Sequence, residues 1–195
     1  MIKVGLTGGI GSGKSYVAKI FSALNIPVYN SDLEAKKLYL RQDVRESIIA
    51  NFGKSIYLPT GNIDKIRLAK IIFNDKKALN KINSIIHPLV KEHFNQWIEE
   101  QQHAPYIIKE AAILFESGAY KDMHKIIAVT APLELRIERV IKRDHTDREI
   151  ILKKISNQLS DKELIKKSDF NIINDKKALL PQVLKIHKTL LKMNR

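Results

Sequence analysis

Glycines, a lysine and a serine crowd one short stretch near the start of the chain. Five of the chain's 8 glycines lie between Gly5 and Gly13, and Lys14 and Ser15 follow directly. From Gly8 onward the residues GGIGSGKS match the pattern G-x-x-x-x-G-K-[ST], which is typical of a phosphate-binding loop. Glycine lets backbone N–H groups curl round a phosphate, and a serine hydroxyl is a ligand for Mg²⁺. The stretch therefore predicts binding of a nucleoside triphosphate together with Mg²⁺.

The same stretch disfavours a dinucleotide fingerprint, because no G-x-G-x-x-G register fits and Lys14 stands where the third glycine is needed. We expect Lys14 to reach the β- and γ-phosphates and to act in catalysis, and Ser15 to be the metal ligand. The residues of this stretch expected to contact the nucleotide are Gly8, Gly9, Gly11, Ser12, Gly13, Lys14, Ser15 and Tyr16.

Asp32 is the informative carboxylate, because it follows a short apolar run, Pro27–Asn30, that reads as a second strand. Parallel strands bring their C-terminal ends to one edge of a sheet, so Asp32 is expected beside the phosphate loop. A carboxylate there can take a proton from a substrate hydroxyl. The alternative is a helix N-cap, for which Ser31 or Asp32 is well suited, and position alone leaves the two interpretations equal.

Arginine is concentrated in one segment of this Lys-rich chain. Only 8 of the 34 basic residues are arginine, yet Arg136, Arg139, Arg143 and Arg148 follow one another closely. The first three are spaced to share one face of a helix. Guanidinium groups bind phosphate bidentately, and a mobile helix that carries them is what a closing lid requires. The alternative is a solvated helix face paired with neighbouring acids, and it applies most to Arg136.

Other candidate residues carry weaker signals. His87 precedes a proline, where it could simply end one helix before the next begins. Glu110 and Glu116 lie on either side of the end of the third predicted strand, where a carboxylate could hold Mg²⁺ through water or could equally be solvated. Phe94 and Trp97 lie three residues apart on an amphipathic pattern and are expected in a core.

Apolar runs that alternate with helical periodicity indicate an α/β chain with a parallel sheet. Residues 32–102 are expected to be mostly helical, with turns at 51–54 and 58–62. The hexapeptide NDKKAL occurs at 74–79 and 174–179, and both copies are expected to start helices. The last helix is expected to bury Leu179, Leu180, Val183, Leu184, Ile186 and Leu190. The predicted strands are Ile2–Thr7, Pro27–Asn30, Tyr106–Lys109, Lys125–Thr130 and Phe170–Asn174.

The composition limits the classes of protein to which this chain can belong. The 195 residues, 44% of them hydrophobic, suit a single globular domain, and the absence of cysteine excludes disulfides and thiolate metal sites. The N-terminus lacks the apolar region of a signal peptide, so a cytoplasmic protein without a membrane partner is expected. The net charge of +13 suggests anionic partners. The lysines are scattered in pairs and form no basic block, so a solvated Lys-rich surface is the alternative and charge alone does not decide. The expectation is no nucleic-acid partner.

Several classes of phosphate-loop protein lack their signatures in this chain. The one near match to the guanine-reading N-K-x-D is Asn80–Asn83, with Asn where Asp is needed, and the strand at 106–110 ends in Lys-Glu instead of a motor ATPase's Asp-Glu. Three readings stay open: a kinase of the type that Asp32 and the arginines suggest, another phosphate-loop kinase acting on a nucleotide, shikimate or gluconate, and a basic protein that binds RNA or DNA with ATP as a switch.

Over essentially its full length the chain resembles the dephospho-CoA kinase family. The matching stretches are GLTGGIGSGKS at 5–15, PVYNSD at 27–32, HPL at 87–89, ILFE at 113–116, RVIKRD at 139–144, Gln158 and IIN at 172–174. The resemblance implies a nucleoside-monophosphate-kinase-like, phosphate-loop NTPase fold with a five-stranded parallel core at about 1–31, 103–135 and 169–195. It also implies a helical substrate-binding insertion at about 32–102 and a helical lid at about 136–168.

The resemblance also implies a reaction: transfer of the γ-phosphate of ATP to the ribose 3′-hydroxyl of dephospho-CoA, with Mg²⁺, as the last step of coenzyme A biosynthesis. It matches Asp32 to the family's catalytic aspartate, and Arg139 and Arg143 to its lid arginines. Asn174 then lies in the adenine-side loop and joins the ATP contacts, while His87 and Glu116 join Asp32 as substrate contacts. A monomer is expected, and a homo-oligomer is left open.

The chain departs from the family pattern at four places. Asn30-Ser31-Asp32 stands where the family often reads D-A-D, so Asp32 is the acid that remains. Ala112 replaces a usual proline, Lys36 a common arginine and Tyr16 a common threonine. These departures affect the expected substrate contacts and favour Asp32 as the base.

Overall fold

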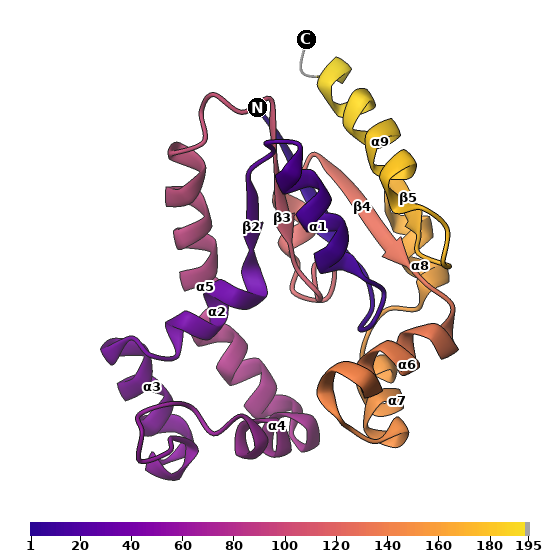
Figure 1. The fold of residues 1–195 in the computed structure, drawn as a ribbon. Helices are drawn as coiled ribbons and strands as arrows, with labels where there is room; N and C mark the ends of the chain where they lie inside the picture. Colours follow the sequence, from indigo (N-terminus) through magenta and orange to yellow (C-terminus); the bar gives the residue numbers. More distant parts are fainter. Residues whose placement is uncertain (194–195) are drawn as a thin grey trace. The chain divides into compact units, whose positions relative to one another are not determined.

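The computed structural model describes residues 1–193, without the side chains of residues 65, 73 and 74. The chain divides into two compact units. The first consists of Met1–Asn30 together with the chain from Gln101 onward, and the second is Ser31–Glu100 (Figure 1). Within residues 1–193, no helix has the length and apolar character needed to cross a membrane.

A parallel sheet forms the centre of the first unit. Its strands lie in the order β2-β3-β1-β4-β5, and every neighbouring pair is parallel. This sheet confirms the predicted α/β fold class and places the C-terminal ends of all five strands at one edge. The strands are β1 (Ile2–Thr7), β2 (Val28–Asn30), β3 (Tyr106–Glu110), β4 (Lys125–Thr130) and β5 (Phe170–Ile173).

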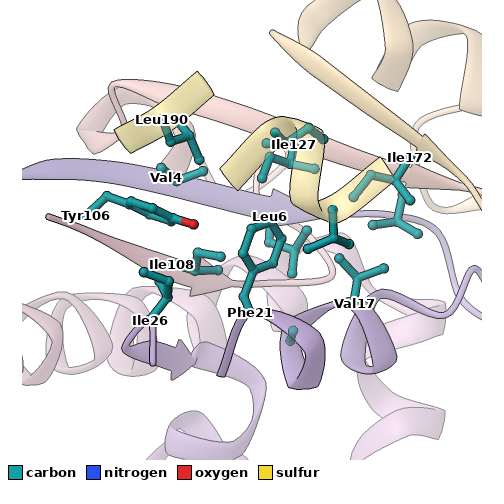
Figure 2. Packing of buried hydrophobic residues seen from close by; sticks show 14 of the residues in the cluster. Val4, Leu6, Val17, Phe21, Ile26, Tyr106, Ile108, Ile127, Ile172 and Leu190 are labelled. Carbon is teal, nitrogen blue, oxygen red and sulfur yellow. The ribbon is translucent and has the colours of Figure 1, made fainter. Parts of the chain in front are cut away.

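Helices α1 and α9 pack against each other and against the sheet in this unit, where the main hydrophobic core lies. Figure 2 shows Val17 and Phe21 of α1 pointing toward Leu6 of β1, with Leu190 of α9 beside Val4. The predicted stripe of the last helix is buried at four positions, whereas Leu180 is 50% exposed because it lies beside that stripe. The helical elements are α1 (Lys14–Ala23), η2 (Ala119–Asp122), α6 (Leu133–Asp144), α7 (Arg148–Ser156), α8 (Asp161–Lys167) and α9 (Leu179–Met193).

β5 lies at one edge of the sheet, and a side chain of α9 bonds to its main chain. The amide of Gln182 accepts a hydrogen bond from Ile173 N at 2.9 Å and donates one to Ile173 O at 3.0 Å. One side chain therefore satisfies both main-chain groups of the last residue of this edge strand.

The second unit is helical, as predicted, with a break at Gly53 and a turn near residues 58–62. The interpretation of His87 as a helix end is wrong, because α5 continues through Pro88. Its buried residues Ile82, Ile86, Val90 and Phe94 form one apolar stripe on both sides of the proline, which outweighs the one backbone hydrogen bond that proline removes. The elements are α2 (Ser31–Leu38), α3 (Gln42–Phe52), η1 (Lys54–Ile56), α4 (Lys65–Asn74) and α5 (Lys76–Glu99).

The two copies of NDKKAL adopt different structures. In the first, the Asp75 side chain accepts a hydrogen bond from Lys77 N and caps α5, as predicted. The expectation for the second copy is wrong, because α9 begins only at Leu179 and the residues before it form a loop with Lys176 at φ 79°. Asn174 N donates to Thr130 O, so Asn174 still lies along β4, and the left-handed φ of Lys176 prevents a regular helix from running through this copy.

Candidate nucleotide-binding site

The glycine-rich stretch connects the end of β1 to the start of α1, as the motif requires. Gly13 precedes α1 with φ 90°, a left-handed conformation that favours glycine, and a Cβ there would collide with Asn174 Nδ2. Since Gly13 has no side chain, it does not cap the first N–H groups of α1, and these groups with the helix dipole form a site for an anion.

Glu110 lies at the centre of the charged part of the site. Its side chain accepts hydrogen bonds from Ser15 Oγ at 2.6 Å, Lys14 Nζ at 2.9 Å and Asn30 Nδ2 at 2.9 Å. It is only 2% exposed, because β3 lies beside β1 with Glu110 opposite Leu6. The sequence left open whether this carboxylate is solvated, and the structure shows it buried against the phosphate loop.

Asn174 and Arg139 hold the main-chain carbonyl groups of the loop. Asn174 Nδ2 donates to Ser12 O at 2.8 Å, and Arg139 Nη1 donates to Gly11 O at 3.4 Å. The two side chains also bond to each other, from Arg139 Nη2 to Asn174 Oδ1 at 3.0 Å. These bonds hold the main chain of the loop against α6 and the residue after β5. The Ser12 hydroxyl is buried and, within the described part of the chain, has no hydrogen-bond partner.

The arginines of residues 136–148 divide into two pairs with different surroundings. Arg136 and Arg139 reach the phosphate loop, and Arg136 is only 4% exposed, which contradicts its interpretation as part of a solvated face. Arg143 instead pairs with Asp144 on the surface, and their hydrogen bond raises the pKa of Arg143 and lowers the pKa of Asp144. Arg148 pairs with Glu134 in the same manner. The helical spacing is therefore correct, but Arg143 does not point at the loop in this structure.

The segment between α7 and α8 also contacts the first unit's other loops. Gln158 Oε1 accepts a hydrogen bond from Ile10 N at 2.8 Å, and the exposed Glu116 accepts one from Leu159 N at 3.0 Å. Gln158 is among the residues that match the family, but no role was predicted for it, because a lone glutamine after a helix has no chemical signature. Tyr16, in the first turn of α1, is 62% exposed and available to a ligand.

Two predicted site residues belong to the second unit. Asp32 is half-buried and lies in the first turn of α2, where a carboxylate interacts favourably with the helix dipole. It is the second residue of the helix, so it lies inside the first turn and not at the N-cap position before it. His87 is half-buried near the middle of α5.

Comparison with known proteins identifies the family. The sequence model of the family described as dephospho-CoA kinase matches residues 2–179. The chain belongs to the dephospho-CoA kinase family. A dephospho-CoA kinase from Bacteroides fragilis (strain YCH46) is 42% identical over 187 residues, which cover 95% of this chain and 91% of the relative. A dephospho-CoA kinase from Fusobacterium nucleatum is 41% identical over 157 residues, or 80% of this chain and 81% of the relative.

Solved structures agree with this family assignment. A dephospho-CoA kinase from Campylobacter jejuni is 25% identical, with a TM-score of 0.70, and the match covers 99% of this chain and 98% of that chain. A shikimate kinase from Bacteroides thetaiotaomicron, 11% identical with a TM-score of 0.53 over 97% and 98% of the two chains, shares the fold alone. The predicted phosphate-loop kinase fold is therefore confirmed.

Proposed function

We propose that this chain transfers the γ-phosphoryl group of ATP to the ribose 3′-hydroxyl of dephospho-CoA, giving coenzyme A and ADP. The observation that carries the proposal is the contact of Lys14 and Ser15, at the end of the phosphate loop, with the buried Glu110 in a chain of the dephospho-CoA kinase family. A loop of this kind binds the phosphates of ATP, and the family name specifies the acceptor.

Ser15 and Glu110 are the residues proposed to hold Mg²⁺, Glu110 through water. Their oxygen atoms lie 2.6 Å apart and are of the hard type that Mg²⁺ prefers. Among residues 1–193 there is no group of three or more His, Cys, Asp or Glu side chains that could hold a metal ion. Phosphate oxygens would therefore complete the coordination, as is usual for Mg²⁺ with nucleotides. The bound ion would neutralise charge on the phosphates.

The other side chains have separate proposed roles. Lys14 exchanges its contact with Glu110 for the γ-phosphate, and Asp32 accepts the proton of the 3′-hydroxyl as the phosphoryl group transfers. Arg139 and Arg143 stabilise the charge that spreads over the transferring group. Arg143 can do so only if its surface pair with Asp144 opens.

The remaining contacts complete the proposal. Tyr16, Ser12 and Asn174 contact ATP, while His87 and Glu116 contact dephospho-CoA. We place the reaction in the cytoplasm and expect a monomeric enzyme without a nucleic-acid or membrane partner.

Purified chain incubated with ATP, Mg²⁺ and dephospho-CoA tests the proposal, with coenzyme A measured by mass spectrometry and ADP by a coupled assay. We expect turnover that Lys14→Ala abolishes without unfolding the protein, because this ammonium group neutralises γ-phosphate charge. Shikimate, gluconate and nucleoside monophosphates serve as control acceptors. Preferred turnover of one of these, or salt-sensitive binding of RNA or DNA without any kinase activity, would contradict the proposal.

A further inference from the structure

The peptide groups of Ile10, in the middle of the phosphate loop, are held from two sides. Ile10 N donates to Gln158 Oε1 at 2.8 Å, and Ile10 O accepts from Arg136 Nε at 2.9 Å. The side chain of Ile10 packs against a hydrophobic cluster that α6 and α7 form, which contains Ile137, Val140 and Ile151. Ile10 therefore directs its main chain and its side chain toward α6, α7 and the segment that follows them.

Arg136 is the buried charge in this arrangement. Its guanidinium forms an ion pair with Asp161, the first residue of α8, at 2.9 Å. Only 5% of the Arg136 side chain is exposed, so the ion pair and the bond to Ile10 O replace the water that burial removes. A Cβ on Gly9 would collide with the guanidinium, and a Cβ on Gly11 would collide with the Arg136 main chain. Two loop glycines are thus explained by how closely Arg136 approaches.

We infer that Arg136 is a positioning residue for ATP binding, which Asp161 holds in place and which acts through Ile10. It fixes the Ile10 carbonyl toward α6, so the loop has its phosphate-binding shape before the nucleotide arrives. A loop that is already ordered loses less conformational entropy when it binds. Arg136 is therefore predicted to strengthen ATP binding without contacting the reacting atoms. The inference rests on ATP as the nucleotide of the proposed reaction.

The test compares ATP affinity and steady-state kinetics in Arg136→Gln, Arg136→Lys and Asp161→Asn. Losing a hydrogen bond to a charged group implies a rise of about tenfold in the ATP dissociation constant of Arg136→Gln, measured by calorimetry. Its KM for ATP should rise in parallel, while kcat and the KM for dephospho-CoA stay close to those of the wild type. Arg136→Lys keeps the charge but loses the planar fork, so it should rescue the affinity only in part. Asp161→Asn should raise the dissociation constant in the same direction.

Asp169→Asn is the matched control. Asp169 forms a 2.8 Å ion pair with Lys125 at the opposite end of the sheet, with 34% of its side chain exposed against 28% for Asp161. This control should leave ATP affinity unchanged.

Wild-type ATP affinity in folded Arg136→Gln overturns the inference, as does a fall in kcat with an unchanged KM for ATP. If Arg136→Gln does not fold, Asp161→Asn decides, and unchanged affinity in that variant overturns the inference. Failure of the proposed function is a different result, in which the wild type binds ATP but does not phosphorylate dephospho-CoA.

Discussion

Ser15 Oγ and Lys14 Nζ donate to the same oxygen, Oε1 of Glu110, at 2.6 and 2.9 Å. The side chains of Lys14 and Glu110 are 11% and 3% exposed, so this is a largely buried ion pair. Without nucleotide, Glu110 supplies the negative charge that Lys14 needs, whereas bound phosphates would supply it in the complex. Stability and nucleotide binding are therefore linked at this one carboxylate.

Glu110→Gln tests that link. Removing one partner of a buried ion pair is expected to destabilise the protein by roughly 3 kcal/mol and to lower the Tm by about 6 °C or more. ATP without Mg²⁺ should narrow the difference in Tm from the wild type, because phosphate then pairs with Lys14 while the proposed metal contact of Glu110 plays no part. Thermal unfolding with and without nucleotide measures both effects. Glu134→Gln, which removes an exposed pair with Arg148, is the control and should change the Tm little. An equal Tm deficit with and without ATP would contradict the link.

Asp32→Asn separates a catalytic base from a structural carboxylate. Asn keeps the shape and most of the hydrogen-bonding capacity, and loss of a general base typically reduces the rate on the order of 10²–10⁴-fold. We expect kcat to fall at least about a hundredfold, with ATP affinity and Tm close to those of the wild type. The matched control is Glu34→Gln in the same helix turn, which removes the negative charge from a 2.8 Å ion pair with the exposed Lys37. A variant that keeps more than about a tenth of wild-type kcat would assign Asp32 to the helix alone.

The first half of α6 and the segment at residues 143–148, which runs from the end of α6 to the start of α7, should differ in hydrogen exchange. Arg136, Ile137 and Val140 are buried, so amides in the first half should exchange slowly even without ligand. Residues 143–148 are mostly exposed and should exchange fast in the free protein. ATP and dephospho-CoA together should slow exchange at residues 143–148, because Arg143 would leave Asp144 for phosphate. Exchange that is identical with and without ligands would identify residues 143–148 as a static surface.

Lys176→Gly tests backbone strain in the loop before α9. Lys176 has φ 79°, and a left-handed conformation destabilises a non-glycine residue by roughly 1 kcal/mol. Replacing Lys176 by glycine removes this strain. Part of the gain in stability is lost because glycine makes the unfolded chain more flexible, so we expect the Tm to rise by about 1–3 °C. Lys177→Gly is the control. Lys177 lacks a positive φ, so this variant should be less stable than the wild type. A lower Tm for Lys176→Gly would show that the lysine side chain has a stabilising role.

The strands, the phosphate loop and the helical nature of residues 31–100 were predictable, because each depends on local periodicity or on a contiguous motif. The role of Arg136 was not, since it depends on Ile10 and Asp161, which lie 126 and 25 residues away in the sequence. The prediction that the second NDKKAL copy starts a helix was wrong for a similar reason. Asn174 Nδ2 donates to Ser12 O and its Oδ1 accepts from Arg139, so contacts 162 and 35 residues away occupy the side chain that was expected to cap a helix.

Glu110 shows the same limit within the site. The sequence placed it at the end of a strand, but its burial depends on the neighbouring strands β1 and β2, which bring Lys14, Ser15 and Asn30 to it. Strand order is a property of the whole sheet, and apolar periodicity does not encode it. Once the strand order is known, the positions of the three donors to Glu110 are explained.

The bond between Gln182 and Ile173 has a consequence for how the molecule behaves in a crowded solution. An edge strand with open N–H and C=O groups is a template on which another chain can add a strand and begin to aggregate. At Ile173 both groups are already bound to the Gln182 amide, so a foreign strand would have to displace it to extend the sheet there. The Gln182 side chain therefore opposes the addition of a foreign strand at the C-terminal end of β5.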